Sequence, residues 1–385
     1  MLSNLRTLKP NLMSIADQRN DSETRIETPV TPSPPVLAIF SASGVHALRS
    51  GYSLLTDYLP NVRVLTAKRS APQGLARLWR FGISRSAVTS WYQIGSASVE
   101  LRAWREIRKG FQGIVHFLWA DSDFGRMDLL ASSKNYALCG TFHQPPSMLR
   151  KIIRFPNRLR HFDAVILMSE TQRPYFLESG VPAASIHVIH HGVDTTFFHP
   201  TEQPAQASFT ILSVGSYLRN FELLRDVCSR MESTSGVRFR IVAPEHVRPL
   251  FAENANVEFL SKISDDQLLM EYRSASCFLF TAEEATANNS LLEALACGLP
   301  VVAEDVGGVR EYVSPLCAEI VKQGDVSGIV EALLRLRTSH RLKAMAAAAR
   351  QRAETLDWKL VAQRTSSVYT ALSQRIAGTR KSQHV

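Results

Sequence analysis

The chain has 385 residues, of which 45% are hydrophobic and 21% are charged, so it is a globular protein long enough for two domains of similar size. No uncharged apolar run approaches the ~18 to 20 residues of a membrane-spanning helix, and the first residues lack the continuous apolar core of a secretory signal. We therefore expect a cytoplasmic protein. The five cysteines lie far apart and form no CxxC pair, which argues against disulfides and zinc.

The net charge of +9 is concentrated in the first half of the chain. Residues 1–200 hold 23 Lys and Arg against 14 Asp and Glu, whereas residues 201–385 hold 21 of each. Within residues 67–111, basic side chains are interleaved with aromatic ones such as Trp91 and Trp104. Such a surface suits anionic lipid headgroups, at about 1 kcal/mol per basic residue, and would place the protein at the inner face of a membrane. The alternative is solvated helix faces with the tryptophans in the core. Charge alone would also attract nucleic acid, but we do not expect that partner.

The first half of the chain alternates between buried strands and helices. Residues 1–35 are polar and end in a proline-rich run, which predicts a disordered tail. An apolar strand at 36–40 opens the fold and is followed by the small-residue loop SASG and by a helix that begins near Gly51. Further buried strands are predicted at 61–67, 113–120, 136–142, 164–169 and 187–193. Strand, loop and helix in repetition imply a parallel sheet covered on both faces.

A second series of strands follows the polar segment 199–208, which contains Pro200 and Pro204 and is the best candidate for an interdomain linker. Its strands are predicted at 209–216, 238–244, 256–261, 275–282, 299–306 and 318–323. The sequence therefore predicts an α/β protein with two doubly wound halves facing each other. In such sheets ligands bind past the carboxyl ends of the strands, so the cleft between the halves is the expected site.

The helix predicted at 289–298 is the best marked in the chain. Asn289 or Ser290 can cap its start, and Gly298 followed by Pro300 ends it. Ser290 and Glu293 also have capping-box spacing, in which Glu293 would merely accept a bond from a backbone N–H. A helix start that points into a cleft is, however, also an anion site.

This helix lies within the segment EEATANNSLLEALACGLPVVAEDVGGVREYV (283–313), which resembles the donor-binding signature of the retaining GT-B glycosyltransferases of family 4 type (glycosyl transferases group 1). The segments 185–200, 209–216 and 256–280 resemble other parts of that family in the same order. The resemblance covers nearly all of residues 36–375. It implies two Rossmann-like domains that face each other across a cleft.

The resemblance also assigns a role to each domain. An acceptor-binding domain would span 36–200 and a nucleotide-sugar-binding domain 201–357. A C-terminal helix at about 358–378 would pack back on the first domain.

The resemblance implies a role for individual residues. Glu293 would bind the ribose hydroxyls and Glu284 the hydroxyls of the transferred sugar, while His143, after a buried strand, would face the reacting sugar. Glu284, His143 and Arg219 are the expected catalytic residues. The other expected donor-binding residues, several of them through backbone groups, are Gly215, Ser216, Lys262, Ile263, Asn288, Asn289, Ser290, Gly307 and Gly308. An acceptor-side loop would include Ser43, Gly44 and Gly51. His190 and His191 are interpreted as packing or loop residues.

The sequence departs from the family pattern in two places. The usual glutamate spacing is eight positions, yet the residue eight before Glu293 is Ala285. Either Ala287 is an extra residue in a bulged loop, which we favour, or the first carboxylate is absent. The family normally supplies two cations for the diphosphate, whereas this chain offers Arg219 alone. A guanidinium can grip phosphate in a bidentate way, and an exposed arginine at a helix start is the alternative.

These features predict a glycosyltransferase that moves a sugar with retention from a UDP- or GDP-type donor to a glycan or lipid-linked acceptor in surface polysaccharide or glycolipid synthesis. No metal or other cofactor is expected, because Asp121 and Asp123 match a metal-binding DxD motif only weakly. No pair of carboxylates is arranged as in a glycosidase. The alternative is a non-catalytic protein of the same fold that binds a sugar nucleotide or glycan.

Overall fold

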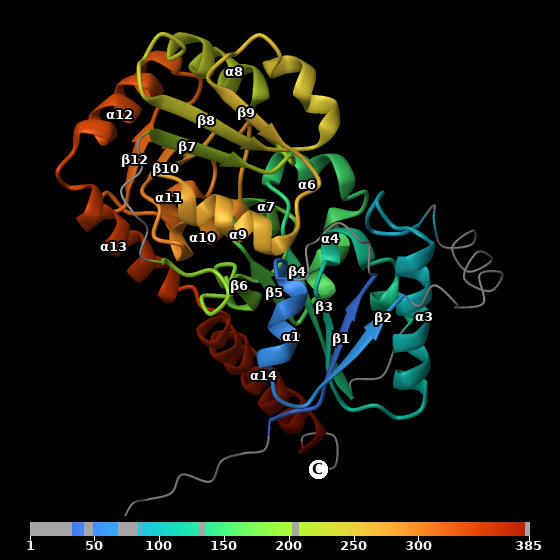
Figure 1. Ribbon diagram of the computed structural model, residues 1–385. Coiled ribbons are helices and arrows are strands. Elements are labelled where there is room, and N and C mark those ends of the chain that lie inside the picture. The colour runs from blue at the N-terminus through green and yellow to red at the C-terminus, as the bar shows by residue number, and fades with distance from the viewer. Residues whose placement is uncertain are drawn as a thin grey trace, which may run out of the picture. The chain divides into compact units, whose positions relative to one another are not determined.

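The structure, a computed structural model, describes residues 33–41, 49–67, 84, 86–130, 135–201 and 208–381, with side chains to residue 378 (Figure 1). The predicted tail up to residue 32, the acceptor-loop residues Ser43 and Gly44, and all of 68–83 lie outside this description. The described part of the predicted tail, residues 33–35, reaches the fold, because the carbonyl of Pro35 accepts a bond from the N–H of Ile114 (2.9 Å).

The first half of the chain forms a six-stranded parallel sheet in the order β2-β1-β3-β4-β5-β6. Its strands are β1 (Val36–Phe40), β2 (Val62–Thr66), β3 (Gly113–Phe117), β4 (Tyr136–Phe142), β5 (Ala164–Leu167) and β6 (Ile186–Val188). In register, Val36 lies opposite both Val62 and Ile114. Strands β3 and β5 are buried at every position, as expected for strands covered on both faces.

The second half repeats this plan in the order β12-β11-β10-β7-β8-β9. Its strands are β7 (Phe209–Val214), β8 (Val237–Val242), β9 (Val257–Leu260), β10 (Cys277–Phe280), β11 (Val301–Glu304) and β12 (Ala318–Val321). Phe278 of β10 lies opposite Val301 and Leu212. The predicted fold class, two doubly wound Rossmann-like sheets, is confirmed.

Helices flank both sheets. In the first half they are η1 (Tyr52–Leu54), α1 (Leu55–Tyr58), α3 (Ile94–Arg108), α4 (Ala120–Asp123), α5 (Met127–Leu130), α6 (Pro146–Ile152), η2 (Pro156–His161), η3 (Glu170–Gln172), α7 (Arg173–Glu178) and η4 (Ala183–Ser185). In the second half they are α8 (Phe221–Arg230), η5 (Glu245–Phe251), α9 (Asp265–Ser274), α10 (Asn289–Ala296), α11 (Val309–Tyr312), α12 (Val326–Thr338), α13 (Leu342–Glu354) and α14 (Trp358–Lys381). None of the described helices is long and apolar enough to cross a membrane.

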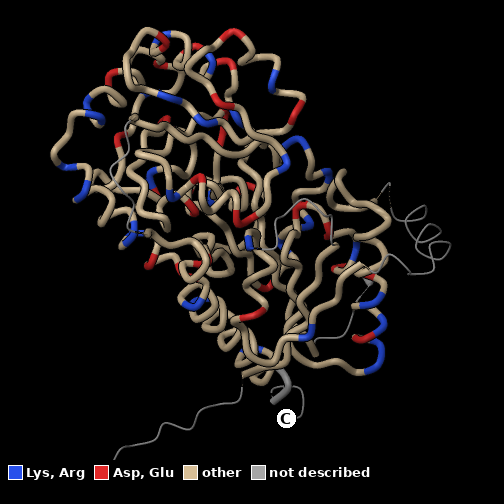
Figure 2. The backbone as a smooth tube through the Cα atoms, in the orientation of Figure 1, with Lys and Arg blue, Asp and Glu red and all other residues tan. Residues whose placement is uncertain are grey.

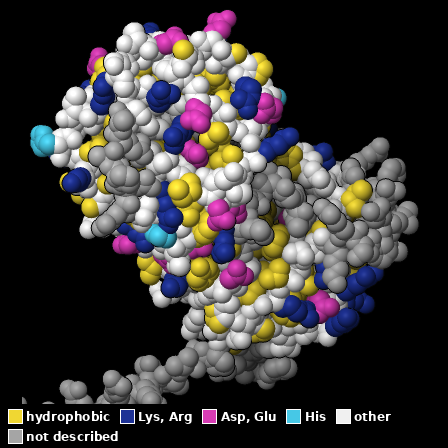
Figure 3. All heavy atoms as spheres, in the orientation of Figure 1, with side chains coloured by type: hydrophobic (Ala, Val, Ile, Leu, Met, Phe, Trp, Pro, Cys, Tyr) yellow, Lys and Arg dark blue, Asp and Glu magenta, His cyan; other side chains and the backbone are white. Residues whose placement is uncertain are grey.

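Helix α3 carries much of the basic, aromatic segment. Trp91, Trp104 and Phe111 are partly buried against the core of the first sheet, whereas Arg105 and Arg108 are exposed. Figure 2 shows Lys and Arg positions along this helix, and Figure 3 shows basic side chains on the same side of the molecule. The aromatic residues that the structure describes therefore belong to the core, and the cations face outward.

The last helix, α14, packs against the first sheet although it follows the second one in the chain (Figure 1). The Tyr369 hydroxyl lies 2.6 Å from Nδ1 of His116 on β3, and Nε2 of His116 lies 2.8 Å from the Thr141 hydroxyl on β4. Burial lowers the pKa of His116 to about 3, so this histidine is neutral. The buried ring of Trp358 packs against Tyr52 and completes the same core.

The chain crosses between the two halves twice, and the two crossings lie side by side. The first crossing follows β6 and the second precedes α14. The N–H of Val193 donates to the carbonyl of Leu356 (3.0 Å), and the Thr195 hydroxyl donates to the carboxylate of Asp357. At Gly192 an added Cβ would come within 2.4 Å of the Trp358 ring, so only glycine allows this close approach.

Candidate functional site

Loops from the two halves meet at the carboxyl ends of β4 and β10, where the parallel topology predicts a site. The Thr286 hydroxyl, after β10, donates to the carbonyl of His143, after β4. The Tyr217 hydroxyl, after β7, donates to the side-chain oxygen of Gln144 (2.6 Å). The residues predicted to act together are therefore held close by direct hydrogen bonds between the halves.

Helix α10 begins at Asn289, as predicted, but its N-cap is neither of the two predicted residues. The N-cap is Asn288, which has an extended backbone and whose side-chain oxygen accepts the N–H of Leu291 (3.2 Å). The same oxygen accepts the Ser290 hydroxyl (2.8 Å). Asn289 and Ser290 lie in the first turn, so the prediction that one of them caps the helix is wrong. The short Asn288 side chain is preferred because its oxygen can reach back to the free N–H groups.

Glu293 does not complete a capping box. It is buried on α10, where Oε2 accepts the Tyr272 hydroxyl (2.8 Å) and Oε1 accepts the hydroxyl of Ser50 from the first half. The capping-box alternative is therefore wrong. Burial raises the pKa of Glu293, and the two hydroxyl donors oppose that rise because they stabilise the carboxylate.

The three residues at 283–285 point in different directions. Glu283 is exposed, Ala285 is buried in the core of the second half, and half-buried Glu284 accepts the hydroxyl of Ser147 on α6. Glu284 therefore faces the first half, and Ala285 does not. Ala287 packs partly against the cores of both halves. Whether Glu284 binds a sugar stays a prediction.

Arg219 is buried, with 7% of its surface exposed, so the alternative of an exposed arginine at a helix start is wrong. Its Nη2 donates to the carbonyl of Val214 (2.8 Å) and to the side-chain oxygens of Asn288 (2.9 Å) and Ser290 (2.6 Å). Its guanidinium carbon lies 4.2 Å from the centre of the Phe280 ring. Burial lowers the pKa of Arg219 to about 10, which leaves the side chain cationic at neutral pH.

The charge of Arg219 is not neutralised by an ion pair with any described carboxylate, and its Nη1 is buried without a hydrogen-bond partner among the described residues. An unpaired buried cation is costly. The arrangement therefore favours an anion that binds at the start of α10, where the free N–H groups and the helix dipole also favour negative charge.

His143 is enclosed by aromatic rings. Its imidazole stacks on Trp119 (5.5 Å between ring centres, 24° between planes) and meets Tyr52 edge-on (4.9 Å). Both ring nitrogens are buried without a hydrogen-bond partner among the described residues. An imidazole with unsatisfied nitrogens beside the loop of Thr286 is suited to bind a polar ligand.

Asp121 and Asp123, the carboxylates of the weak DxD match, accept hydrogen bonds from other groups of the protein. Asp121 accepts the backbone N–H groups of His143 (2.8 Å) and Gln144 (3.1 Å). Asp123 accepts the N–H (2.8 Å) and hydroxyl of Ser41 and the hydroxyl of Ser96 (2.7 Å). Within the described ranges, no cluster of three or more His, Cys, Asp or Glu is arranged to hold a metal ion.

Gly307 and Gly308 pack the loop after β11 against the loop after β10. Gly307 has a φ of +48°, and an added Cβ would lie 1.9 Å from the carbonyl oxygen of Ala285. At Gly308 an added Cβ would lie 2.6 Å from the carbonyl oxygen of Thr286. Close approach of the two loops thus requires both glycines. Contact with a nucleotide stays a prediction.

The remaining predicted residues differ in whether they contact Arg219 and Glu293. Gly215, with a φ of +114°, lies against Arg219, and Ser216 beside it is exposed. Lys262 has a φ of +54° and with Ile263 forms the loop between β9 and α9. No interaction connects Lys262 or Ile263 to Arg219 or Glu293 in the part of the chain that the structure describes. Gly51 lines a narrow cavity with Ser50, Asn289, Glu293 and Trp358.

Sequence reasoning missed the partners that the first half supplies. Ser50 and Ser147 contact the two glutamates, and Tyr272 holds Glu293 from α9. Ser147 follows a strand end and the pair Pro145-Pro146, so its place near the cleft could have been inferred. No sequence signal identifies Ser50 or Tyr272.

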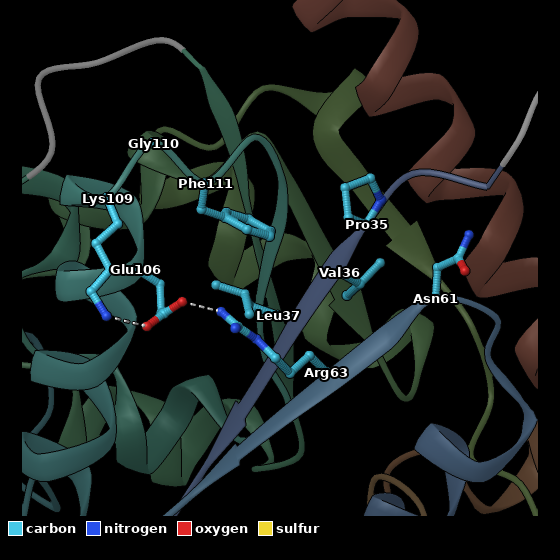
Figure 4. A pocket seen from close by; sticks show the side chains of 9 residues that line it. All are labelled: Pro35, Val36, Leu37, Asn61, Arg63, Glu106, Lys109, Gly110 and Phe111. Atoms are coloured by element: carbon cyan, nitrogen blue, oxygen red, sulfur yellow. Dashed lines mark hydrogen bonds and ion pairs between the residues drawn. The ribbon is translucent and has the colours of Figure 1, made fainter.

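A larger cavity, of about 460 Å³, lies at the opposite end of the first sheet (Figure 4). It is lined by the start of β1, by Asn61 and Arg63, and by Glu106 and Phe111 near the end of α3. Glu106 there pairs with Arg63 and Lys109. Because it lies at the amino ends of the strands, where doubly wound sheets do not bind ligands, we do not assign the site to it.

Comparison with known families gives two matches. Residues 208–339 match the family described as glycosyl transferases group 1. Residues 61–197 match the family described as glycosyltransferase family 4. Together the matches cover both sheets apart from β1.

Two curated relatives represent the sequence matches. The chain is 29% identical over 209 residues to MMP alpha-(1->4)-mannosyltransferase of Mycolicibacterium hassiacum, an alignment that covers 51% of each chain. It is 25% identical over 402 residues to a sulfoquinovosyl transferase of Arabidopsis thaliana, over 91% of this chain and 77% of the relative. The alignment with the mannosyltransferase thus spans about half of that protein's length.

Solved structures share the fold at low identity. A glycosyltransferase from Rickettsia africae superposes with a TM-score of 0.68 at 15% identity and covers 89% of this chain and 99% of its own. Anabaena HepE in complex with UDP and glucose superposes with a TM-score of 0.64 at 14% identity, over 88% of this chain and 100% of its own. These similarities show a common fold.

We predict that Gly307→Ala lowers the free energy of unfolding by roughly 3 kcal/mol, because the new Cβ overlaps a backbone oxygen and the left-handed conformation is strained. Urea unfolding measures this change. The control is Gly324→Ala, which has a φ of +79° but no atom within 4 Å of the new Cβ, so it should cost only about 1 kcal/mol. Equal losses for the two variants would contradict the close packing of the loops.

Proposed function

Since this chain belongs to the group 1 glycosyltransferases of the GT-B fold, we propose that it transfers a hexose with retention from a UDP- or GDP-sugar to a glycan or lipid-linked acceptor. The proposal includes a role in surface polysaccharide or glycolipid synthesis and action on the cytoplasmic side of a membrane. The named relatives transfer different sugars, mannose and sulfoquinovose, and HepE was solved with UDP and glucose. This range supports a nucleotide-sugar donor and leaves the sugar to experiment.

The observation that supports this function most strongly is the unpaired buried cation at the start of α10. Arg219 uses Nη2 to hold Asn288 and Ser290, while Nη1 is buried without a partner among the described residues. A nucleotide diphosphate supplies the missing negative charge and the hydrogen-bond acceptors. The backbone N–H groups of Asn289 and Ser290 in the first turn of α10 would bind the same phosphates.

This geometry accounts for the chemistry of the proposed transfer. Breaking the bond between the anomeric carbon and the donor oxygen leaves negative charge on the diphosphate. Arg219 and the first turn of α10 are fixed before the reaction, so they stabilise this charge without reorganising. Asp121 and Asp123 bind backbone and serine groups, which supports the proposal that transfer needs no metal.

Each of the two glutamates already accepts a hydroxyl, which supports the proposal that both bind donor hydroxyls. Glu293 accepts Ser50 and Glu284 accepts Ser147, both from the first half. We propose that the ribose replaces Ser50 on Glu293 and that the transferred sugar replaces Ser147 on Glu284. Closure of the halves around the donor would exclude water and limit hydrolysis.

We also propose that the first half binds an anionic membrane surface through α3. Arg105 and Arg108 are exposed on this helix, and Lys109 directly after it is exposed as well. Lipid-linked acceptors would be concentrated at such a surface. The proposal does not involve nucleic acid.

The function is tested by incubating the protein with a panel of UDP- and GDP-sugars and measuring release of nucleotide and transfer. We expect one donor to be turned over in EDTA and the product anomer, read by NMR, to match the donor. Arg219→Ala should lower kcat by about 100-fold or more, because the leaving diphosphate loses its cation. The control Arg225→Ala removes a partly exposed cation on α8 that pairs with Glu222 and Asp226, and it should leave kcat unchanged.

Two outcomes of this panel would oppose the proposal. Binding of a donor without turnover would instead support a non-catalytic binding protein. Normal turnover by Arg219→Ala would remove the proposed role of the buried cation.

We predict that Ser50→Ala tightens binding of UDP or GDP about tenfold, because the free protein loses a charged hydrogen bond that the ligand would otherwise displace. Isothermal titration calorimetry measures the change. Ser53→Ala, a change in η1 at a serine that does not bond to Glu293, should leave the affinity unchanged. Weaker binding by Ser50→Ala would show that Ser50 contacts the ligand instead of yielding to it.

Membrane binding is tested by sedimentation with phosphatidylglycerol-containing vesicles. Reversing two charges with Arg105→Glu and Arg108→Glu should weaken binding by more than tenfold, at about 1 kcal/mol for each basic residue lost. Reversal of the exposed residues Lys343 and Lys359 in the second half is the control and should have no effect. Equal binding to pure phosphatidylcholine vesicles would contradict an electrostatic contact.

A further inference from the structure

The neighbours of His143 fix the position of its ring, but they do not determine which of its two nitrogens carries the proton. The stacked ring of Trp119 and the edge of Tyr52 restrict the plane of the imidazole. Neither Nδ1 nor Nε2 has a hydrogen-bond partner among the described residues. Packing alone does not decide which nitrogen carries the proton, so a polar group must decide it.

Asp121 is the titratable group next to this imidazole. Its carboxylate is buried, and Oδ2 accepts the N–H groups of His143 and Gln144. Its other oxygen, Oδ1, lies 3.9 Å from Nδ1 of His143. One oxygen therefore fixes the backbone at the end of β4, and the other faces the imidazole.

We propose that Asp121 is a positioning residue that keeps the proton of His143 on Nδ1. A small approach turns the 3.9 Å separation into a hydrogen bond from Nδ1 to Oδ1, as happens when the loose hydrogen bonds of a free enzyme tighten on substrate. The proposal rests on the proposed sugar transfer, in which His143 contacts the reacting sugar. Asp121 acts through His143 and does not touch the sugar.

The consequence is a defined chemical role for Nε2. With the proton on Nδ1, Nε2 presents a lone pair and can only accept a hydrogen bond. A sugar hydroxyl is a suitable donor and would satisfy this buried nitrogen. The opposite tautomer would present an N–H at Nε2 and would select an acceptor instead.

The two oxygens of Asp121 have separate partners, and this allows the proposed role to be distinguished from a purely structural one. The backbone N–H groups of His143 and Gln144 need one carboxylate oxygen only, and both bind Oδ2. An asparagine can keep these two bonds with its carbonyl oxygen. Its NH₂ group would then replace Oδ1 beside Nδ1, and it would donate to that nitrogen and invert the tautomer.

The test is Asp121→Asn in the full-length protein with ¹⁵N-labelled histidine. Long-range ¹⁵N–¹H NMR identifies the protonated nitrogen of each ring, and the signal lost in His143→Ala assigns His143. We expect the proton on Nδ1 in the wild type and on Nε2 in Asp121→Asn. With the donor found by the panel, kcat should fall at least tenfold while KM for the donor changes less than threefold, as for one hydrogen bond made in the transition state.

The matched control is Asp123→Asn, which changes a buried carboxylate two residues away that binds serines and not His143. It should keep the proton of His143 on Nδ1. A wild-type proton on Nε2, or an unchanged tautomer in a folded Asp121→Asn protein, would overturn the proposal. The wild-type spectrum decides the first point even if the variant does not fold. If the wild type transfers no sugar, the proposed function fails, and the NMR result still decides the role of Asp121.

Discussion

An unpaired cation inside the protein is the constraint on which the second half of the site depends. Arg219 lies on the ring of Phe280, with its Nη2 on the end of β7 and on the N-cap of α10. These contacts satisfy part of the guanidinium, but no described carboxylate forms an ion pair with it, which is unusual for a buried cation. The strand end, the helix start and the loop between them therefore surround a positive charge, and this arrangement supports the proposed binding of an anion.

The groups that the first half of the chain contributes to the site around Arg219 are uncharged. Hydroxyls of Ser50 and Ser147 and the backbone carbonyl of His143 reach the loops of the second half. Bonds from a hydroxyl to a carboxylate exchange readily with the hydroxyls of a sugar, because donor and acceptor types are the same. The contact between the halves is thus polar at the site where we propose that the donor binds, whereas each half has its own apolar core.

Periodicity and strand patterns predicted both parallel sheets because each buried strand reads as an apolar run, and the family resemblance located Glu284, Glu293, Arg219 and His143. Local contacts were harder to predict. The N-cap is Asn288, one residue before the predicted candidates. The predicted capping box does not form, because Glu293 instead accepts a hydrogen bond from Ser50, 243 positions away. The hydrogen bond between Ser50 and Glu293 depends on how the two halves of the chain pack together, so a local sequence pattern does not predict it. Asp121 was read as a weak metal motif because the bonds that occupy it come from the backbone of another strand end.

The paired crossings beside Gly192 and Trp358 have a mechanical consequence. Two chain segments bonded along their length form a seam, so the halves can turn about it but cannot slide apart. If the halves turn about this seam, residues far from it are displaced more than residues beside it. Glu293 and Ser50 share a narrow cavity with Trp358 beside this seam, whereas Glu284 and Ser147 do not line that cavity. In the proposed function, a turn of the halves about the seam would therefore open the end that binds the transferred sugar more widely than the end that binds the ribose.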